Sequence, residues 1–449
     1  MGAFECYFTS IKEKKIAVLG LGVSNRPLVR LLLEFGCQVT GCDRTPREKV
    51  DAEVLELEEL GCKLSLGDGY LENVEAELLF RTPGMHPGHP AIRALADKGA
   101  EVTSEMEVFF EVCPCPIIAV TGSDGKTTTT TLVSEMLKAE GRKVWLGGNI
   151  GTPLLPLVRQ MQETDIAVVE LSSFQLMDMT RSPGRAVVTN LSPNHLDVHK
   201  DMDEYVEAKK NIFRFQKETD LLVLNADNAI TAAFTGNGVT KTFSRLGTGN
   251  VCLRNGVICR DGTAVLDSKD ILLPGVHNIE NYMAAIAVVE GLVSDETVVR
   301  VAKTFGGVEH RIELVRIKDG VRFYNDSIAS SPSRTIAGLR SFSEKVILIA
   351  GGYDKHSPYD VLGPEVCRHV KKLFLCGATA PQIRAAVENC QGEKPEMTDC
   401  GDFESAVRAA AAAAESGDVV LMSPASASFD QFKNFMVRGE CFKKIVMEL

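Results

Sequence analysis

A stretch that begins at residue 117, IIAVTGSDGKTTTTTLVSEML, contains the residue types that bind phosphate. An apolar run ends at a glycine-bearing turn, and a lysine with five threonines leads into a segment with helical spacing. Glycines let backbone N–H groups turn toward phosphate oxygens, a lysine reaches the terminal phosphates, and a threonine hydroxyl is a ligand for Mg²⁺. The stretch therefore indicates a nucleotide-binding turn, although the usual P-loop would have a glycine where Val120 stands.

Other polar residues follow apolar runs further along the chain. Glu170 ends the run in AVVELSSFQL, where a carboxylate can hold Mg²⁺ beside a phosphate. The same stretch could simply be a helix start, because Ser172 and Ser173 are good N-cap residues. His195 and Lys209 follow the next run, and taken alone each is typical of an exposed position.

The N-terminal stretch VLGLGVSN resembles an incomplete dinucleotide fingerprint. Gly20 and Gly22 precede Asp43 by about 20 residues, but Asn25 stands at the third glycine position. The pattern is compatible with NAD binding by a dehydrogenase or with binding of another phosphate-bearing ligand. The loop RTPGMHPGHP, residues 81–90, could close over that ligand or form a rigid turn.

Three polar loops in the last third of the chain follow predicted strands. They contain Asp326 and Ser330, then Lys355, then Ser428 and Phe429. Loops at the carboxyl ends of parallel strands share one edge of a sheet, so these loops could face one crevice. A lysine among polar side chains suits a small carboxylate substrate, although each loop alone has a common turn composition.

The elements that must position these residues alternate between short β-branched runs and helical patterns. Strands are predicted at 15–20, 37–42, 116–122, 165–171, 186–191, 220–225, 345–352, 373–377 and 418–424, and helices at 127–140, 203–216, 278–290, 332–340, 380–390 and 402–415. Continuous apolar strands separated by helices predict an α/β fold with parallel sheets covered on both faces. We expect three domains, over residues 1–104, 105–307 and 308–449.

Composition limits the classes of function. The 449 residues carry a net charge of −11 without a long basic run, which argues against nucleic-acid binding. Thirteen cysteines show no zinc-type spacing, and the absence of a secretory signal favours a cytoplasmic protein with reduced thiols. No apolar run approaches the roughly 18 residues that span a bilayer.

Taken together, the motifs resemble those of the Mur ligases. The matching stretches occur in the family's order over nearly the whole chain: VTGSDGKTTT, GGNIG, VVELSSFQL, SPNHLDVH, YVEAKKNIF, LPGVHNIENYMAA, EHRIE, YNDS, GGYDK and SPASASFDQFKNF. LSSFQL and SPASASFDQFKNF are most similar to the members that add D-glutamate. The family's ATP loop has the same short glycine spacing.

The resemblance implies a Rossmann-like N-terminal domain, a central P-loop-type ATPase domain and a C-terminal dinucleotide-fold-like domain. It implies an ATP-dependent amide ligase that adds D-glutamate to UDP-N-acetylmuramoyl-L-alanine through an acyl phosphate, in peptidoglycan precursor synthesis. ATP and two Mg²⁺ ions would be required. The partners would be small molecules, with no nucleic acid and no membrane insertion, and we expect a monomer.

The resemblance also implies roles for single residues. Lys126, Glu170, His195 and Lys209 would be catalytic, with Lys209 carried as a carbamate, and the metal ligands would be Thr127, Glu170, His195 and Lys209. ATP would contact Gly122, Ser123, Asp124, Gly125, Lys126, Thr127, Thr128, Asn278, Arg311 and Asp326. The UDP-substrate would contact Val23, Ser24, Asp43, Arg44, Gly84 and Asn149, and D-glutamate would contact Ser330, Lys355, Ser428 and Phe435.

Three positions depart from the family pattern. Asp124 replaces a common asparagine and would repel ATP phosphates, so we expect its side chain to turn outward. Ile328 stands at a frequent lysine position, which removes one positive charge from the amino-acid region, and Ser330 replaces a threonine but keeps the hydroxyl.

Several alternatives share some of these features. Another Mur ligase or a folylpolyglutamate synthetase would share the ATP core, but the latter begins with its ATPase domain, and the DNPR-type motif of the diaminopimelate-adding member is absent. A dehydrogenase would leave Lys126, Glu170 and His195 without a role. A nucleotide-binding regulator without catalysis would not need these three residues together with Lys209.

Overall fold

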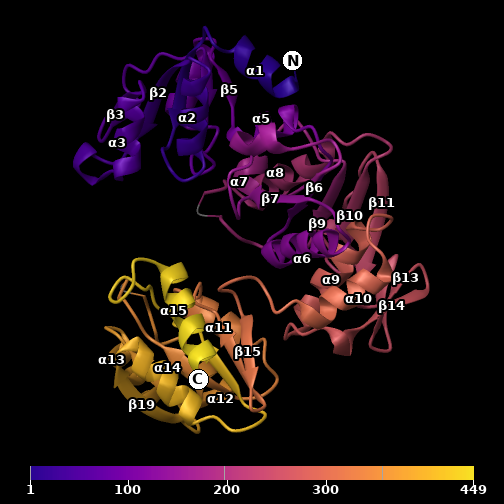
Figure 1. Cartoon of the computed structure of the whole chain (residues 1–449), viewed down its shortest axis with the longest axis vertical. Helices are drawn as coiled ribbons and strands as arrows, with labels where there is room; N and C mark the ends of the chain where they lie inside the picture. The colour runs from indigo at the N-terminus through magenta and orange to yellow at the C-terminus, as the bar shows by residue number, and fades with distance from the viewer. Residues whose placement is uncertain (1, 197, 356) are drawn as a thin grey trace. The chain divides into compact units, whose positions relative to one another are not determined.

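The computed structural model describes residues 2–196, 198–355 and 357–449, and their strands form three separate sheets (Figure 1). The chain divides into two compact units, residues 1–268 with 280–301 and residues 269–279 with 302–449. The N-terminal and central sheets belong to the first unit and the C-terminal sheet to the second. The expected α/β fold is confirmed, while the domain boundaries after residues 104 and 307 stay a prediction.

The N-terminal sheet is entirely parallel, in the order β3-β2-β1-β4-β5. Its elements are α1 (Ala3–Ser10), β1 (Lys15–Leu19), α2 (Asn25–Glu34), β2 (Gln38–Asp43), α3 (Ala52–Glu59), β3 (Lys63–Leu66), β4 (Leu78–Phe80), α4 (Pro90–Asp97) and β5 (Glu101–Thr103). Ile16 and Val18 join one buried cluster and Ala17 and Leu19 another, so β1 is covered on both faces. The strand order reverses between β1 and β4, and ligands of such sheets bind at that point.

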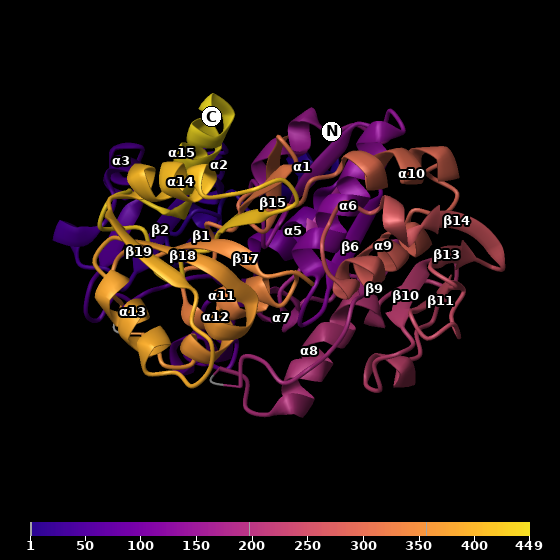
Figure 2. The same ribbon diagram turned by 90° about the horizontal axis from the view of Figure 1, so that it is seen from below.

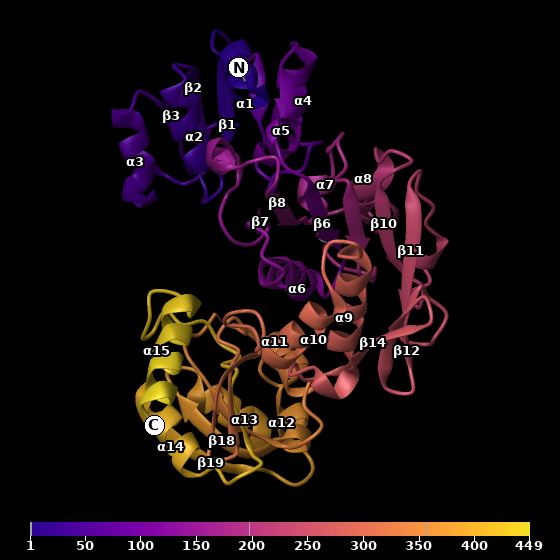
Figure 3. The ribbon, with the colours of Figure 1, turned by 45° about the vertical axis from the view of Figure 1, so that its right-hand side comes forward.

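The central sheet has nine strands, in the order β14-β13-β12-β11-β10-β9-β6-β8-β7. The strands are β6 (Ile117–Thr121), β7 (Val144–Gly148), β8 (Ile166–Glu170), β9 (Arg185–Val188), β10 (Leu221–Asn225), β11 (Val239–Ser244), β12 (Val251–Arg254), β13 (Val257–Arg260) and β14 (Thr263–Asp267). The helices of this part of the chain are α5 (Glu105–Val112), α6 (Lys126–Ala139), α7 (Ser173–Leu176), α8 (Met202–Arg214), α9 (Val276–Val288) and α10 (Asp295–Thr304). Figure 3 shows β10 beside β11, with which it pairs in parallel.

The central sheet is parallel, as predicted, except for an antiparallel edge that the sequence did not predict. Strands β12, β13 and β14 pair antiparallel. Asn255 and Gly256, with φ of 49° and 80°, form the first turn, and Asp261 and Gly262, with φ of 47° and 86°, form the second. Turns of two residues can join only antiparallel neighbours, and these positive φ values favour Asn-Gly and Asp-Gly pairs.

The C-terminal sheet has the order β15-β16-β20-β17-β18-β19 and is parallel except for β15, a strand that the sequence did not predict. Its elements are β15 (Glu313–Lys318), β16 (Val321–Asn325), α11 (Pro332–Leu339), β17 (Val346–Ala350), α12 (Gly363–His369), β18 (Val370–Cys376), α13 (Ala380–Glu388), β19 (Glu396–Gly401), α14 (Phe403–Ala412), β20 (Val419–Met422) and α15 (Phe435–Glu448). Helices α11, α12 and α13 cover one face, and α14 and α15 cover the other (Figure 2).

The strands and helices that the sequence predicts are confirmed, each with ends within three residues of the expected ones. Short 3₁₀ helices lie at Arg47–Lys49, Leu155–Gln160, Thr231–Ala233 and Ser268–Asp270. Within the described part of the chain, none of the helices combines the length and the apolar character needed to cross a membrane.

Candidate active site

The phosphate-loop sequence forms a tight turn between β6 and α6. Gly122 has a φ of 150°, and a Cβ atom there would lie 1.9 Å from Thr189 Oγ1. Gly125 has a φ of 77° and precedes α6, and a Cβ atom there would lie 2.4 Å from Asn281 Oδ1. Both positions therefore require glycine. The turn leads into the N-terminus of a 14-residue helix, whose N–H groups and dipole favour a bound anion.

Thr189 and Asn190, which follow β9, form hydrogen bonds with the backbone of this loop. Asp124 N donates to Asn190 Oδ1 at 3.0 Å, and Asn190 Nδ2 donates back to Asp124 O at 3.2 Å. Thr189 Oγ1 donates to Asp124 O at 2.6 Å, and Ser123 N to Asn190 O at 2.8 Å. Asp124 is exposed, and the outward direction of its side chain from the ATP phosphates stays a prediction. The sequence analysis missed Thr189 and Asn190, whose only signal was their place at the end of an apolar strand.

Asn281 on α9 is a second residue that the sequence analysis missed. Its Oδ1 accepts a hydrogen bond from Thr129 Oγ1 at 3.2 Å, and it lies close to Gly125. Asn278, one turn earlier and expected to contact ATP, is buried, and its Nδ2 donates to Pro274 O at 2.7 Å. Both asparagines stand in the stretch HNIEN. Because Asn281 follows Asn278 by three residues, helical spacing could have indicated that both lie on the same side of the helix.

Two of the lysines expected to be catalytic converge on one carbonyl oxygen. Lys126 Nζ donates to Gly122 O at 3.0 Å and to Ser123 O at 2.8 Å. Lys209 Nζ donates to the same Gly122 O at 2.9 Å and to Thr121 Oγ1 at 3.1 Å. The nitrogen atoms of two lysine side chains thus meet at the base of the phosphate loop.

Lys209 is almost completely buried, with 1% of the residue exposed. Helix α8 carries it there, and Asp201 caps that helix by accepting a hydrogen bond from Glu204 N. Burial and the nearby charge of Lys126 hold the pKa of Lys209 well below its usual value, although Glu170 opposes the shift. The Tyr205 ring centroid lies 5.0 Å from Lys209 Nζ. This environment favours a neutral amine over an ammonium.

Glu170 ends β8 and is buried beside the same loop. Asn149 Nδ2 donates to Glu170 Oε1 at 2.7 Å, and Asn149 N donates to Glu170 O at 2.8 Å. Glu170 Oε2 is buried and has no hydrogen-bond partner among the described residues. A buried carboxylate oxygen left in this way is suited to a hard cation, so the donor set fits Mg²⁺. Thr127, another expected ligand, lies in the first turn of α6 and is half-buried.

The expected metal ligand His195 lies in the loop after β9 and is exposed, with a φ of 56°. Its ring makes an edge contact with Phe174, at 5.1 Å between ring centroids. Phe174 lies on α7, four residues after Glu170, so the histidine loop packs against the segment that follows this carboxylate.

His199 is a buried histidine that the sequence analysis missed. Its Nε2 lies 2.9 Å from Ser173 Oγ, and its ring stacks on Phe174 at 5.3 Å. Burial lowers the pKa of His199, and Glu204 partly opposes that shift. A neutral ring wedged between α7 and α8 therefore supports the segment that carries His195.

At the N-terminal sheet, Asp43 holds the turn after β1. Its Oδ2 accepts from Leu21 N at 2.8 Å and its Oδ1 from Thr45 N at 2.9 Å. Burial alone would raise the pKa of Asp43, but these backbone hydrogen bonds, the Thr45 side chain and the charge of Arg44 together lower it. Arg44 is exposed beside it. The carboxylate is thus already engaged in shaping the turn.

Asn25 takes the place of the third glycine of the fingerprint. It is buried, and its Nδ2 donates to the carbonyl oxygens of Leu19 and Gly20 at 3.0 and 2.9 Å. Val23 and Ser24, two expected substrate contacts, are exposed on the turn that this side chain fixes.

The loops after β1 and β4 approach each other closely. A Cβ atom on Gly20 would lie 3.0 Å from the Thr82 side chain, whereas one on Gly84 would have nothing within 4 Å. Gly84 is exposed, so this expected substrate contact borders open space at the reversal point of the sheet.

In the second unit, Asp326 follows β16 and is buried. Its Oδ2 accepts from Ser423 Oγ at 2.7 Å and its Oδ1 from Ile312 N at 3.3 Å. Burial raises the pKa of Asp326 to about 7, against the effect of these hydrogen bonds. The carboxyl group therefore holds the segment beside Arg311, which is itself exposed.

Of the four residues expected at D-glutamate, three lie on loops of the C-terminal sheet, and Phe435 is the first residue of α15; the three on loops are Ser330, Lys355 and Ser428. Arg438, missed by the sequence analysis, ties two of these loops together. Its guanidinium donates to Ser327 Oγ and O and to the carbonyl oxygens of Ser426 and Ala427, at 2.9 to 3.1 Å. Burial lowers its pKa to about 10.

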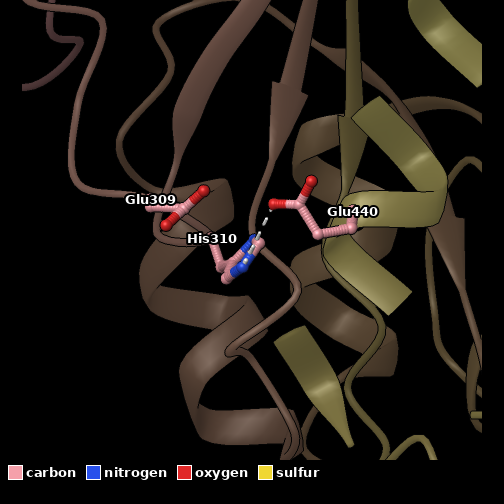
Figure 4. A group of neighbouring side chains, drawn as sticks. All are labelled: Glu309, His310 and Glu440. Atoms are coloured by element: carbon pink, nitrogen blue, oxygen red, sulfur yellow. Dashed lines mark ion pairs between the residues drawn. The ribbon is translucent and has the colours of Figure 1, made fainter. Parts of the chain in front are cut away.

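A second group with metal-ligand residue types lies in the second unit. Glu309, His310 and Glu440 offer atoms within 4.8 Å of one another (Figure 4). However, Lys443 Nζ lies 2.7 Å from Glu309 Oε1 and 3.1 Å from Glu440 Oε1. Asn325 Nδ2 donates to His310 Nδ1 at 3.0 Å, which leaves the proton of a neutral ring on Nε2. The lysine already supplies the positive charge, so this group is an ion-pair cluster.

Two family models match the chain. The model described as "Mur ligase middle domain" matches residues 120–289, and the one described as "Mur ligase, glutamate ligase domain" matches residues 310–426. Together they cover more than half of the chain, including the phosphate loop and all six strands of the C-terminal sheet.

Curated relatives match over almost their whole length. The chain is 54% identical to the UDP-N-acetylmuramoylalanine–D-glutamate ligase of Acetivibrio thermocellus, over 97% of each chain. It is 50% identical to the protein of that name from Ruminiclostridium cellulolyticum, over 99% of each chain. Among solved structures, the UDP-N-acetylmuramate-alanine ligase of Thermotoga maritima aligns with a TM-score of 0.59 at 18% identity, over 97% of this chain and 100% of that chain. That last likeness supports the fold alone.

Proposed function

The chain belongs to the Mur ligase family, and from this premise we propose that it joins D-glutamate to UDP-N-acetylmuramoyl-L-alanine while ATP is converted to ADP and phosphate. The relatives of that name at 54% and 50% identity support this choice within the family. In the structure, the observation that carries the proposal is the convergence of Lys126 and Lys209 on the carbonyl oxygen of Gly122. The product would be a precursor of peptidoglycan.

The reaction would proceed in two steps. A carboxylate oxygen of the L-alanine residue attacks the γ-phosphorus of ATP, and the bond from this phosphorus to the β–γ bridging oxygen breaks. ADP departs, and the substrate becomes an acyl phosphate. The amine of D-glutamate then attacks the acyl carbon, a tetrahedral intermediate forms, and phosphate leaves with the acyl-linked oxygen while the amine loses a proton. Most of the catalysis consists of holding three anions in line, which positioned cations and N–H groups accomplish.

The phosphate loop would hold ATP through the backbone N–H groups at the start of α6 and through the ammonium of Lys126. Asn190 and Thr189 keep the loop in shape before ATP arrives, because they bind the backbone of Ser123 and Asp124. Pre-shaped donors need no reorganisation during the reaction, which is where they lower the barrier.

Mg²⁺ would neutralise charge on the β- and γ-phosphates. The residues proposed to hold two ions are Thr127, Glu170, His195 and a carbamate on Lys209. The partnerless Oε2 of Glu170 supports the first of these sites, and Asn149 orients the carboxylate through Oε1. Phe174 packs against His195 and limits where its ring can lie.

We propose that Lys209 works as a carbamate. Its nitrogen would attack CO₂, a new N–C bond would form, and the proton would leave to solvent. An ammonium beside Lys126 would repel a metal, whereas the carbamate would offer a carboxylate at the end of a buried side chain. The hydrogen bonds from Lys209 Nζ to Thr121 and Gly122 fix the direction of that side chain.

We also propose which residues contact the UDP-substrate, the nucleotide and D-glutamate. The UDP-substrate would contact Val23, Ser24, Asp43, Arg44, Gly84 and Asn149, the nucleotide would also contact Asn278, Arg311 and Asp326, and D-glutamate would contact Ser330, Lys355, Ser428 and Phe435. Because the Asp326 carboxylate is occupied by Ser423 and Ile312, we propose that it acts by holding the Arg311 segment. We propose a monomer that works in the cytoplasm, where ATP is available.

Phosphate release with ATP, Mg²⁺ and UDP-N-acetylmuramoyl-L-alanine tests the proposal. The assay is run with D-glutamate, L-glutamate, L-lysine, meso-diaminopimelate and no amino acid. We expect release that depends on D-glutamate. Release that depends on another amino acid would overturn the amino-acid assignment and keep the ATP chemistry, and no release in any reaction would overturn both.

A further inference from the structure

Arg81 is a fully buried arginine whose role neither the phosphate chemistry nor the sequence motifs explain. It directly follows Phe80, the last residue of β4, and only 1% of it is exposed. Its position is the reversal point of the N-terminal sheet, at the start of the loop that carries Gly84. A buried guanidinium is costly unless its donors are paired, so the partners of Arg81 indicate what it does.

On one side, Arg81 holds the loop proposed to contact the UDP-substrate. Its Nη1 donates to Thr82 O at 3.1 Å and to Met85 O at 2.8 Å. These two carbonyl oxygens flank Gly84, so the guanidinium closes the turn from inside. The position of Gly84 therefore depends on where the Arg81 head group lies.

On the other side, Arg81 holds the segment that follows Glu170. Its Nε and Nη2 donate to the two carboxylate oxygens of Asp178 at 2.8 and 2.5 Å, and Nη2 also donates to Phe174 O at 2.9 Å. A forked pair of this kind fixes both distance and direction. The guanidinium therefore links the N-terminal and central sheets, which belong to one compact unit.

The Phe174 ring extends this link to the proposed metal-binding loop. It stacks on His199 with ring planes 9° apart and makes an edge contact with His195. A shift of the Phe174 backbone would therefore move the surface against which His195 packs.

We propose that Arg81 is a positioning residue that sets the spacing between the UDP-substrate loop and the segment carrying Phe174, and so aligns the bound substrate with the phosphate centre. This inference rests on the proposed function. Lysine could not replace it, because one ammonium with three donors cannot serve Asp178, Phe174, Thr82 and Met85 in a fixed plane.

The test compares Arg81→Lys and Asp178→Asn with the unchanged chain. Arg181→Ala is the matched control, because Arg181 is a half-exposed arginine near Asp178 that pairs with Glu107 and Glu111. Three quantities are measured: the dissociation constant of UDP-N-acetylmuramoyl-L-alanine by calorimetry without ATP, the KM of each substrate with kcat, and Tm.

For Arg81→Lys we expect about a tenfold rise in the dissociation constant and KM of the UDP-substrate and about a tenfold fall in kcat, with the KM of ATP within about twofold. Asp178→Asn should change the same constants in the same direction by a smaller factor, and Arg181→Ala should change none of them. If Arg81→Lys does not fold, Asp178→Asn decides, because it keeps the shape of the side chain.

A lower Tm and kcat with unchanged constants for the UDP-substrate would overturn the proposal, because a purely structural role reduces the amount of active protein without changing affinity. A wild-type affinity in Arg81→Lys would also overturn it. If the unchanged chain binds the UDP-substrate but releases no phosphate with D-glutamate, the proposed function fails while calorimetry still decides the role of Arg81. If it does not bind the UDP-substrate, both fail.

Discussion

Lys209 and Lys355 are both proposed to meet charged groups, but the chain holds them in opposite ways. Lys209 is 1% exposed, and its Nζ donates to Thr121 and Gly122. Lys355 is exposed, and its Nζ lies 5.3 Å from the ring centroid of Phe429, which is itself 56% exposed. The phosphate centre is thus built before any substrate arrives, whereas the amino-acid loops present their charge on a surface.

The two proposed sites differ in how firmly their side chains are held in place. Around the phosphate loop, polar side chains such as Thr189, Asn190 and Lys209 form hydrogen bonds with the loop. In the C-terminal sheet, the buried Arg438 binds two of the loops through Ser327 and Ser426, whereas the side chains of Lys355 and Phe429 are exposed. We infer that changes at the first site abolish chemistry and that changes at the second mainly weaken amino-acid binding.

Replacement of Lys209 should produce the largest effect. We expect Lys209→Ala to lower kcat by about a hundredfold or more, because the proposed carbamate would be lost from a preorganised centre. Short carboxylic acids such as formate or acetate should restore part of the activity by filling the space. Phosphate-release kinetics with and without these acids provide the measurement. Lys210→Ala is the matched control, since Lys210 is the half-buried neighbour on α8. Full activity of Lys209→Ala would contradict the carbamate role.

A change at Phe429 should be milder and confined to one substrate. We expect Phe429→Leu to raise the KM of D-glutamate by about threefold, the size of an exposed cation–π contact, and to leave the KM of ATP unchanged. Steady-state kinetics check both constants. Tyr353→Phe serves as control, because it keeps the ring that makes an edge contact with Phe429. A loss of kcat comparable to that of Lys209→Ala would erase the contrast between the two sites.

Asp124→Asn should have a still smaller effect. Asp124 is exposed and its backbone, not its side chain, is held by Asn190. We therefore expect the KM of ATP to fall by about twofold or less, as for a solvent-screened charge. A change of the KM beyond about tenfold would show that the carboxylate points at the phosphates.

The last prediction compares the two units through stability. Glu105 in the first unit and Asp326 in the second are both buried, and burial raises the pKa of each to about 7. The folded pKa exceeds the unfolded one, so the folded state binds more protons between about pH 4 and pH 7. The contribution of these two carboxyl groups to the free energy of unfolding is therefore fully present at the acidic end of this window. It is lost as pH rises through about 7.

Glu105→Gln should flatten part of this pH dependence. The amide oxygen can still accept the hydrogen bond that Leu155 N donates to Glu105 Oε1 at 3.1 Å. Between pH 4.5 and 7 we expect Tm to fall less in the variant than in the unchanged chain, with Asp326 responsible for what remains. An identical slope in both proteins would contradict the raised pKa of Glu105.

The sequence predicted nine of the strands, six of the helices and the phosphate loop, because these leave local signals. Apolar runs with flanking helices predicted each of the expected strands, and glycine, lysine and threonine together identified the loop. The antiparallel edge was missed because its strands are short and half-exposed, although Asn255 and Gly256 marked the first turn.

Residues that act through distant contacts left no such signal. Lys209 alone is typical of an exposed helix position, and only the resemblance to the Mur ligases singled it out. Asn190, Arg81 and Arg438 bind the backbones of Asp124, Phe174 and Ser327, which lie 66, 93 and 111 positions away. Spacing in one sequence does not reveal such pairs. The type of reaction was therefore predictable from the sequence. The residues that hold the loops in place could be identified only from the structure.

The central claim is that phosphate is transferred to the substrate carboxylate at the loop where Lys126 and Lys209 meet. The most direct test uses UDP-N-acetylmuramoyl-L-alanine labelled with ¹⁸O in the alanine carboxylate, together with ATP, Mg²⁺ and D-glutamate, and analyses the released phosphate by mass spectrometry. We predict that each phosphate carries one oxygen from that carboxylate. Phosphate without the label would mean that water attacks ATP, and it would contradict the account.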